Sequence, residues 1–135
     1  MNKNSGSSMN PAVVCGVDIE YADSLPDTAD FSTHPFYNDN FTNAEITYCI
    51  AQLDPRVHFT ARWCAKEAVK KCIPSLISVD NRCLEIRKLP SGAPYIVLVT
   101  PGGQEPLGAS LSLSHAGRLA IAMVVAQNAA SSASL

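Results

Sequence analysis

The spacing of apolar and polar residues changes along this chain from a strand pattern to a helical pattern and back to strands. Ala12 to Ile19 is a short apolar run rich in β-branched residues, which is typical of a buried strand. The stretch from Tyr21 to Asn40 is polar and interrupted by proline, so we expect mostly loop. We interpret residues 1–11 and 128–135, which are rich in small polar residues, as flexible tails around one domain, residues 12–127.

Two helix starts follow the predicted loop. Thr42 and Glu45 have the spacing of a capping box, in which each side chain satisfies a backbone N–H that the helix leaves free, and the helix should run to about Leu53. Asp54-Pro55 predicts a second start, because an acid suits the N-cap and proline suits the first helical position. This second helix should end near Cys72, since a proline follows two residues later.

The remaining pattern predicts strands joined by turns. Cys83 to Lys88 and Pro94 to Val99 flank a Pro-Ser-Gly turn and indicate a hairpin. Ala109 to Ser114 and Leu119 to Ala126 form a second pair around Gly117. The order of one strand, two helices and four strands predicts an α+β domain, with a largely antiparallel sheet and its helices packed on one face.

Composition and charge narrow the class of protein. The 135 residues are 47% hydrophobic and 16% charged, which indicates one folded globular domain. A net charge of -2 gives no general field for nucleic acid or an anionic membrane, so any bound anion needs a local group of cations. The five cysteines include no CxxC pair, which favours a reducing compartment. Without a signal-like segment or an apolar run of ~20 residues, we expect a cytoplasmic protein.

Three segments carry residues suited to chemistry. In the first, Asp18 and Glu20 stand at the end of the first strand, where two carboxylates can bind a divalent cation or simply face solvent. The second is the helical segment 61–71, in which Glu67 is flanked by four basic residues, Arg62, Lys66, Lys70 and Lys71. It is either a solvated face with Glu67–Lys71 pairing or a helix that binds phosphate and metal.

The third segment is Leu111-Ser112-Leu113-Ser114-His115. Serine hydroxyls and an imidazole at a strand end can bind phosphate oxygens or an adenine edge, and the alternative is a structural histidine. The segment is not a nucleophile elbow, because the glycines of G-x-S-x-G are absent.

Together the segments resemble the holo-acyl-carrier-protein synthase family of 4′-phosphopantetheinyl transferases. That pattern combines G-x-D-[IV]-x-E, F-[TS]-x-x-E, [RW]-x-x-K-E-A-x-x-K and [VL]-S-[IL]-[ST]-H, matched here in order by residues 16–20, 41–45, 63–71 and 111–115. The resemblance covers roughly residues 12–126. Residues 41–49 and 62–69 are especially similar to the transferase domain that ends fungal fatty acid synthases, so the chain is interpreted either as an excised domain or as a bacterial relative that serves a large synthase.

The resemblance implies roles for individual residues. Asp18 and Glu67 would bind Mg²⁺, with Glu20 as a further acid near the metal. Lys71 would contact a phosphate of coenzyme A, and Asp18, Glu67 and Lys71 would be the catalytic group. The remaining residues implied for coenzyme A binding are Arg62, Lys66, Ser114 and His115.

The implied reaction transfers the 4′-phosphopantetheine arm of coenzyme A to a serine of an apo acyl carrier protein, and releases 3′,5′-adenosine bisphosphate. Mg²⁺ would offset charge on the pyrophosphate. Either Glu67 or a metal-bound water would take the serine proton, and the residues do not choose between them. The family also implies a homotrimer with active sites between neighbours. The sequence specifies neither the carrier protein nor a fatty acid or polyketide pathway.

Two features of the chain depart from the family pattern. Many members have a helix before the Ser-x-Ser-His strand, where this chain has only the Gly- and Pro-rich stretch from Thr100 to Gly108. The polar segment after Asp18 lies on the side that receives the carrier in the family.

Two other functions are compatible with a domain of this kind. A non-catalytic coenzyme A-binding or structural module of a larger synthase predicts lost acids, yet Asp18 and Glu67 are present. A general nucleotide-binding protein would need a P-loop or G-x-G-x-x-G segment, which is absent.

Overall fold

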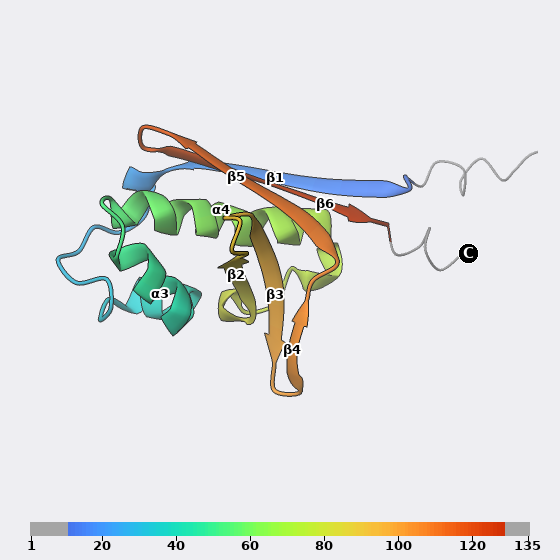
Figure 1. Ribbon diagram of the computed structural model, residues 1–135, viewed down its shortest axis with the longest axis horizontal. Helices are drawn as coiled ribbons and strands as arrows, with labels where there is room; N and C mark the ends of the chain where they lie inside the picture. Colours follow the sequence, from blue (N-terminus) through green and yellow to red (C-terminus); the bar gives the residue numbers. More distant parts are fainter. Residues whose placement is uncertain (1–10, 129–135) are drawn as a thin grey trace, which may run out of the picture.

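Six strands and three α-helices build the part of the chain that the computed structural model describes, residues 11–128 (Figure 1). Their order is β1 (Val13–Tyr21), the 3-10 turn η1 (Ala22–Ser24), α2 (Pro35–Asn40), α3 (Asn43–Ile50), α4 (Pro55–Cys72), the 3-10 turns η2 (Pro74–Leu76) and η3 (Asn81–Cys83), β2 (Leu84–Lys88), β3 (Pro94–Thr100), β4 (Gly103–Pro106), β5 (Ala109–Ala116) and β6 (Leu119–Gln127). The predicted α+β class and antiparallel pairing are confirmed. The strands form two sheets, however, in the orders β1-β6-β5 and β2-β3-β4.

Helix α4 lies at the centre of the fold, between the two sheets. The β1-β6-β5 sheet runs along one side of the helix, while α3 and the β2-β3-β4 sheet lie on the other (Figure 1). The helix side that meets the strands carries mainly small residues, namely Cys64, Ala65, Ala68, Val69 and Cys72, all buried in one core cluster. Small side chains let a helix and a sheet approach closely, so this side of α4 is packed and not solvated.

Gly16 fixes how closely β1 approaches α4. A Cβ atom added to Gly16 would lie 2.2 Å from the carbonyl oxygen of Ala68 and 2.8 Å from the backbone nitrogen of Cys72. No side chain fits in that space. Because alternate residues of a strand point to the same side, Asp18 faces α4 as Gly16 does.

The polar segment predicted as loop contains helix α2. The Nδ1 atom of His34 accepts a hydrogen bond from the Phe36 backbone N–H at 3.2 Å and thereby caps the helix. Tyr37, within this helix, and Phe41, directly after it, are fully buried in a second core cluster. A helix of six residues depends on such tertiary contacts more than on its own periodicity, which is why the pattern did not indicate it.

Two further boundaries differ from the prediction. Helix α3 ends at Ile50, earlier than expected, and Asp54 does not cap α4, because its carboxylate accepts a hydrogen bond from Arg118 instead. The gap from residue 100 to 108 holds strand β4. Among the described helices, none is both long and apolar enough to cross a membrane.

Both predicted hairpin turns are confirmed, and each places a glycine in the left-handed region. Gly92 has a φ of 91° and Gly117 a φ of 58°, conformations that residues with a Cβ rarely adopt. The strands on either side pair as expected, β2 with β3 and β5 with β6. The turn at Gly117 matters for the site, because it follows directly on the Ser-x-Ser-His segment of β5.

The two tails expected at 1–11 and 128–135 lie almost entirely outside the described residues. At the edge of the described range, the backbone N–H of Asn128 donates to the carbonyl oxygen of Ala12 at 3.0 Å. This bond continues the pairing of β1 with β6 by one residue.

Candidate active site

Asp18, Glu67 and Lys71 come together where β1 crosses the last turns of α4. The Lys71 Nζ donates to Asp18 Oδ1 at 2.9 Å and to the carbonyl oxygen of Val17 at 3.0 Å. The side chain of Lys71 is 56% exposed and that of Asp18 is 18% exposed. The hydrogen bond to Asp18, aided by the charge of Glu67, raises the pKa of Lys71. The lysine therefore stays charged at neutral pH beside two carboxylates, and most of its surface remains open to a ligand.

The donor set suits Mg²⁺ but is smaller than expected. Mg²⁺ is commonly held by one or two carboxylates, and waters and phosphate oxygens complete its shell, so Asp18 and Glu67 fit. Within residues 11–128 no three His, Cys, Asp or Glu side chains are grouped to hold a metal, so Glu20 is not gathered with them. Its carboxylate accepts from the Tyr21 N–H at 3.0 Å. The family pattern places its acid three residues after the aspartate, where this chain has Tyr21.

Lys66, expected to bind coenzyme A, lies in the core instead. Its side chain is fully buried, and its Nζ donates to Glu45 Oε1 at 2.7 Å, to the Asn40 carbonyl oxygen at 3.0 Å and to the Asn81 carbonyl oxygen at 2.7 Å. An ammonium group has three donors, and all three are used within the protein. The geometry therefore gives Lys66 a structural role and does not support the expected contact with a ligand.

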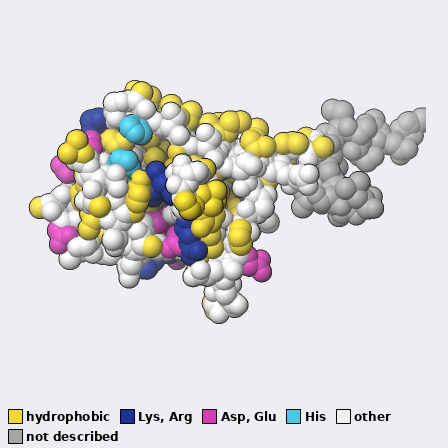
Figure 2. Space-filling view, in the orientation of Figure 1, with side chains coloured by type: hydrophobic (Ala, Val, Ile, Leu, Met, Phe, Trp, Pro, Cys, Tyr) yellow, Lys and Arg dark blue, Asp and Glu magenta, His cyan; other side chains and the backbone are white. Residues whose placement is uncertain are grey.

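A second group of basic residues surrounds a pocket near the start of α4. The pocket has a volume of about 140 Å³ and is lined by His58, Ala61, Arg62, Lys88, Leu113, Ser114 and His115. Figure 2 shows histidine and Lys/Arg side chains adjoining on one face of the molecule. Arg62, Ser114 and His115, which the resemblance implied for coenzyme A, thus meet in one place although about fifty residues separate Arg62 from the others.

Arg62 carries a positive charge that no described carboxylate pairs with. Its residue is 3% exposed, and its guanidinium lies over the ring of Tyr48, with Cζ 4.2 Å from the ring centroid. One terminal nitrogen donates to the carbonyl oxygen of His58 at 3.4 Å, and Nε has no hydrogen-bond partner among the described residues. A buried donor without a partner is costly, so the pocket is suited to an anion.

Arg62 and Lys71 point to opposite sides of α4. Arg62 and Lys71 are nine residues apart, which in an α-helix is two and a half turns and about 13.5 Å along the axis. The sequence motifs list both as coenzyme A residues without separating them. His58 and Lys88, which also line the Arg62 pocket, were not singled out; the i, i+4 spacing of His58 and Arg62 was the one available signal.

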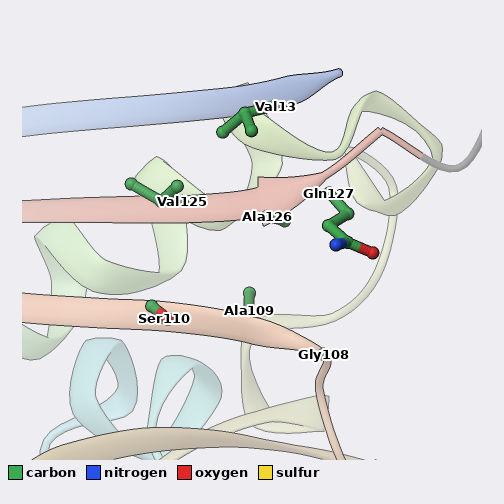
Figure 3. A pocket seen from close by; sticks show the side chains of 7 residues that line it. All are labelled: Val13, Gly108, Ala109, Ser110, Val125, Ala126 and Gln127. Carbon is green, nitrogen blue, oxygen red and sulfur yellow. The ribbon is translucent and has the colours of Figure 1, made fainter. Parts of the chain in front are cut away.

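A larger pocket lies elsewhere and carries none of the expected chemistry. It measures about 320 Å³ and is lined by Val13, Gly108, Ala109, Ser110, Val125, Ala126 and Gln127 (Figure 3). Its lining includes no titratable side chain. The candidate site therefore consists of the Asp18, Glu67 and Lys71 group and the pocket around Arg62.

Comparison with known proteins places these features in a family. The 4′-phosphopantetheinyl transferase superfamily matches residues 14–124. The chain is 30% identical over 110 residues to the holo-[acyl-carrier-protein] synthase of Thermodesulfovibrio yellowstonii, covering 82% of this chain and 94% of that protein. It is 31% identical over 121 residues to fatty acid synthase subunit alpha of Schizosaccharomyces pombe, covering 82% of this chain but 6% of that much longer protein.

Solved structures share the fold at lower sequence identity. The holo-[acyl-carrier-protein] synthase from Neisseria meningitidis superposes with a TM-score of 0.68 at 22% identity, covering 85% of this chain and 98% of that one. The Chronobacterium ammoniagenes ACPS-CoA complex gives a TM-score of 0.66 at 22% identity, covering 87% and 98%. The chain therefore belongs to the 4′-phosphopantetheinyl transferase superfamily and is a transferase of the holo-acyl-carrier-protein synthase type.

Proposed function

We propose that this protein transfers the 4′-phosphopantetheine group from coenzyme A to a serine of an apo acyl carrier protein in a Mg²⁺-dependent reaction. Family membership supports the reaction class. The observation that carries the proposal for this chain is the meeting of Asp18 and Glu67 with the exposed ammonium of Lys71. Carboxylates for a metal and an exposed cation for phosphate are what a pyrophosphate substrate requires.

Each residue then has a defined task. Asp18 and Glu67 hold the metal, and Lys71 turns from Asp18 to the pyrophosphate oxygens when coenzyme A binds. When bound, Mg²⁺ offsets the negative charge on the pyrophosphate. The carrier serine oxygen bonds to the β-phosphorus, the bond from that phosphorus to the bridging oxygen breaks, and 3′,5′-adenosine bisphosphate leaves. The serine proton passes to the Glu67 carboxylate or to a water.

We further propose that the Arg62 pocket binds the 3′-phosphoadenosine end of coenzyme A, on a neighbouring subunit. Arg62, Ser114 and His115 line this pocket, while Lys71 lies on the opposite side of α4. A single subunit therefore presents the two halves of the site in different directions. An assembly in which one subunit supplies Asp18 and its neighbour supplies Arg62 brings the halves to one substrate.

The outer face of the β1-β6-β5 sheet supports a homotrimer of this kind. Its large apolar side chains are about half exposed, and they are Val13, Val17, Ile19, Tyr21, Ile121 and Met123. Ile19 is paired with Ile121 and Val17 with Met123, so the residues form one continuous surface. Contiguous exposed apolar surface of this kind marks an interaction site. A neighbouring copy would cover it.

The carrier proposed for this enzyme is that of a fatty acid synthase. Similarity to fatty acid synthase alpha subunits and to free-standing synthases supports a fatty acid pathway over a polyketide one. All five cysteines are unpaired, in keeping with a cytoplasmic location. The reaction itself does not depend on whether the chain is free-standing or part of a larger synthase.

The direct test is the intact mass of a panel of apo carrier proteins after incubation with the protein, coenzyme A and Mg²⁺. We expect one carrier to gain one phosphopantetheine, and the gain to disappear when the metal is chelated. Coenzyme A binding without any gain across the panel would overturn the transfer reaction and favour a non-catalytic module. Transfer that persists after chelation would remove the metal from the proposal.

The assembly has its own test. Ile19→Glu places a charge in the centre of the apolar face, so light scattering should report monomers while circular dichroism remains that of the folded domain. Transfer should be lost with the trimer although Asp18 and Glu67 are untouched. A fully active monomer would refute the shared site.

A further inference from the structure

We propose that His58 joins Arg62, Lys88 and His115 in a site for a phosphomonoester dianion, and that His58 takes up a proton when the dianion binds. The inference rests on the proposed function, since the monoester would be the 3′-phosphate of coenzyme A. It adds two ligands that the family motifs do not contain, and it adds a coupling between pH and substrate affinity.

The geometry brings four basic side chains from three elements to one pocket. His58 and Arg62 stand one turn apart on α4, Lys88 ends β2, and His115 lies near the end of β5. The rings of His58 and His115 have centroids 5.9 Å apart at an angle of 62°. Tyr48 lies beneath Arg62 and near Lys88, whose Nζ is 5.1 Å from the ring centroid. The four groups therefore surround a small volume of about 140 Å³.

The unpaired positive charges in this pocket favour a bound dianion. Neither Arg62 nor Lys88 forms an ion pair with a described carboxylate, and the Arg62 Nε is buried without a partner in that part of the chain. A phosphomonoester has a second pKa near ~6 and carries almost two negative charges at neutral pH. Each phosphate of a pyrophosphate diester carries about one. The terminal 3′-phosphate is the group on coenzyme A that matches.

The surroundings of His58 explain why a proton follows the ligand. Burial lowers the pKa of His58, and the positive charges of Arg62, His115 and Lys88 lower it further, while Asp54 at the start of α4 is the group that raises it. In the empty pocket the imidazole is therefore neutral at pH 7. A dianion among these cations replaces repulsion by attraction, so the imidazolium becomes the favoured form. Binding should consume protons and strengthen as the pH falls.

Titration calorimetry of coenzyme A binding to the full chain at pH 7.5, in two buffers of different ionisation enthalpy, measures this proton uptake. We expect the native protein to take up a substantial fraction of one proton, and His58→Asn to take up clearly less. One coupled proton changes affinity by at most tenfold per pH unit, so we expect about tenfold tighter binding at pH 6.5 than at pH 8, and a flatter profile in His58→Asn. At pH 8.5, where His58 is neutral either way, the two proteins should bind within about twofold of each other.

Two controls define the ligand and the residue. Dephospho-coenzyme A lacks the monoester, so its binding should be weaker and should not depend on His58. Inorganic phosphate is the other source of a dianion, and it should compete with coenzyme A but not with dephospho-coenzyme A. His34→Asn is the matched variant, because asparagine can replace the histidine that caps α2, and His34 does not line the pocket. It should leave proton uptake unchanged.

The outcomes separate this inference from the proposed function. Equal proton uptake in His58→Asn and the native protein, or equal uptake with dephospho-coenzyme A, would overturn the role of His58 while leaving transfer activity in place. Failure of the native protein to bind coenzyme A at all would instead overturn the proposed function. Reduced proton uptake in His58→Asn, with uptake unchanged in His34→Asn, would support the inference.

Discussion

Helix α4 carries two lysine–carboxylate pairs of nearly equal length in very different surroundings. Lys66 meets Glu45 at 2.7 Å, and Lys71 meets Asp18 at 2.9 Å. In the first pair both side chains are 0% exposed, whereas in the second the lysine is 56% exposed. The two lysines are five residues apart, which places them about 140° apart around the helix, and this difference in direction decides which charge is structural and which is available to a substrate.

The buried pair joins three elements. Glu45 accepts from the Thr42 N–H at 2.9 Å at the start of α3, from Lys66 on α4, and from the Ile86 N–H at 2.9 Å on β2. Every oxygen of the carboxylate and every donor of the lysine is occupied, which is the condition under which buried charges are tolerated. The exposed pair has no such network around the ammonium. In these two pairs, a lysine is structural when all its hydrogen-bond donors are used within the protein, and it is available to a ligand when they are not. Neither its charge nor its place in the motif distinguishes the two cases.

The largest effect is expected when the buried lysine, Lys66, is replaced. Lys66→Met leaves the Glu45 carboxylate buried without its counter-charge, and breaking a buried pair in this way costs about 3–5 kcal/mol. We expect a large drop in the urea midpoint and in Tm, with activity falling only as the folded fraction falls. A change below about 1 kcal/mol would mean that the pair is not buried in solution.

A second variant keeps that prediction falsifiable if Lys66→Met does not fold. Combining Lys66→Met with Glu45→Gln removes both charges and should be less destabilised than the sum of the two single variants. The coupling free energy, measured by urea unfolding, should be of order 1–3 kcal/mol. Additive effects would argue against a direct pair.

The next largest effect is expected at Glu67, the acid that lies near the exposed Lys71–Asp18 pair. Glu67→Gln removes a proposed metal ligand at a partly exposed position, so the free energy of unfolding should change by at most about 0.5 kcal/mol. Carrier modification should fall by more than the roughly hundredfold that loss of a residue supporting a metal ligand can cost. The measurement is the initial rate of carrier mass gain at saturating Mg²⁺, and retention of activity would remove Glu67 from the metal site.

The local elements around the two pairs were predictable from the sequence, because their signals are short in range, but the contrast between the pairs was not. The Thr42–Glu45 capping box is observed, and so are the turns at Gly92 and Gly117. Helix α2 and the division into two sheets were not predicted, since both depend on contacts between distant segments. The capping-box pattern also gave no sign that the Glu45 carboxylate receives Lys66 as well.

The candidate site shows the same limit. The motif places Lys66 and Glu67 side by side and treats both as functional, but adjacent residues of a helix point about 100° apart. Only the packing of α3 against α4 shows that Lys66 faces the core. His58 and Lys88 were missed for the complementary reason, because β2, β5 and α4 meet around them only in the folded chain.

The close approach that creates the exposed pair can be tested at Gly16. Gly16→Ala places a Cβ 2.2 Å from a backbone oxygen of α4, which cannot move aside as a flexible side chain would. We expect about 1–3 kcal/mol of destabilisation and a loss of transfer activity beyond it, because β1 must shift and carry Asp18 away from Lys71. Gly108→Ala is the matched control, since an added Cβ there meets nothing within 4 Å. Equal behaviour of the two variants would show that the approach of β1 to α4 is looser.

A smaller effect is expected from removing the exposed lysine itself. Lys71→Met should change the free energy of unfolding by about 0–1 kcal/mol, as surface ion pairs do. The KM for coenzyme A should rise about tenfold, in line with loss of a hydrogen bond to a charged group, while Lys71→Arg should retain much of the affinity. An unchanged KM in Lys71→Met would assign Lys71 to Asp18 alone and remove it from the phosphate site.

The smallest effect is the response of the two pairs to alkaline pH, and their signs are opposite. The hydrogen bond to Asp18 raises the pKa of Lys71 above its ordinary 10.5, so the contribution of this pair to stability is fully present below pH 10.5 and is lost as the pH rises through the folded value. Burial lowers the pKa of Lys66 against the opposing charge of Glu45, so there the unfolded chain holds more protons and stability rises with pH. Urea unfolding of the native protein and Lys71→Met between pH 9 and 11 isolates the first contribution. The difference between them should shrink towards pH 11, and a constant difference would mean that the Lys71–Asp18 pair does not persist in solution.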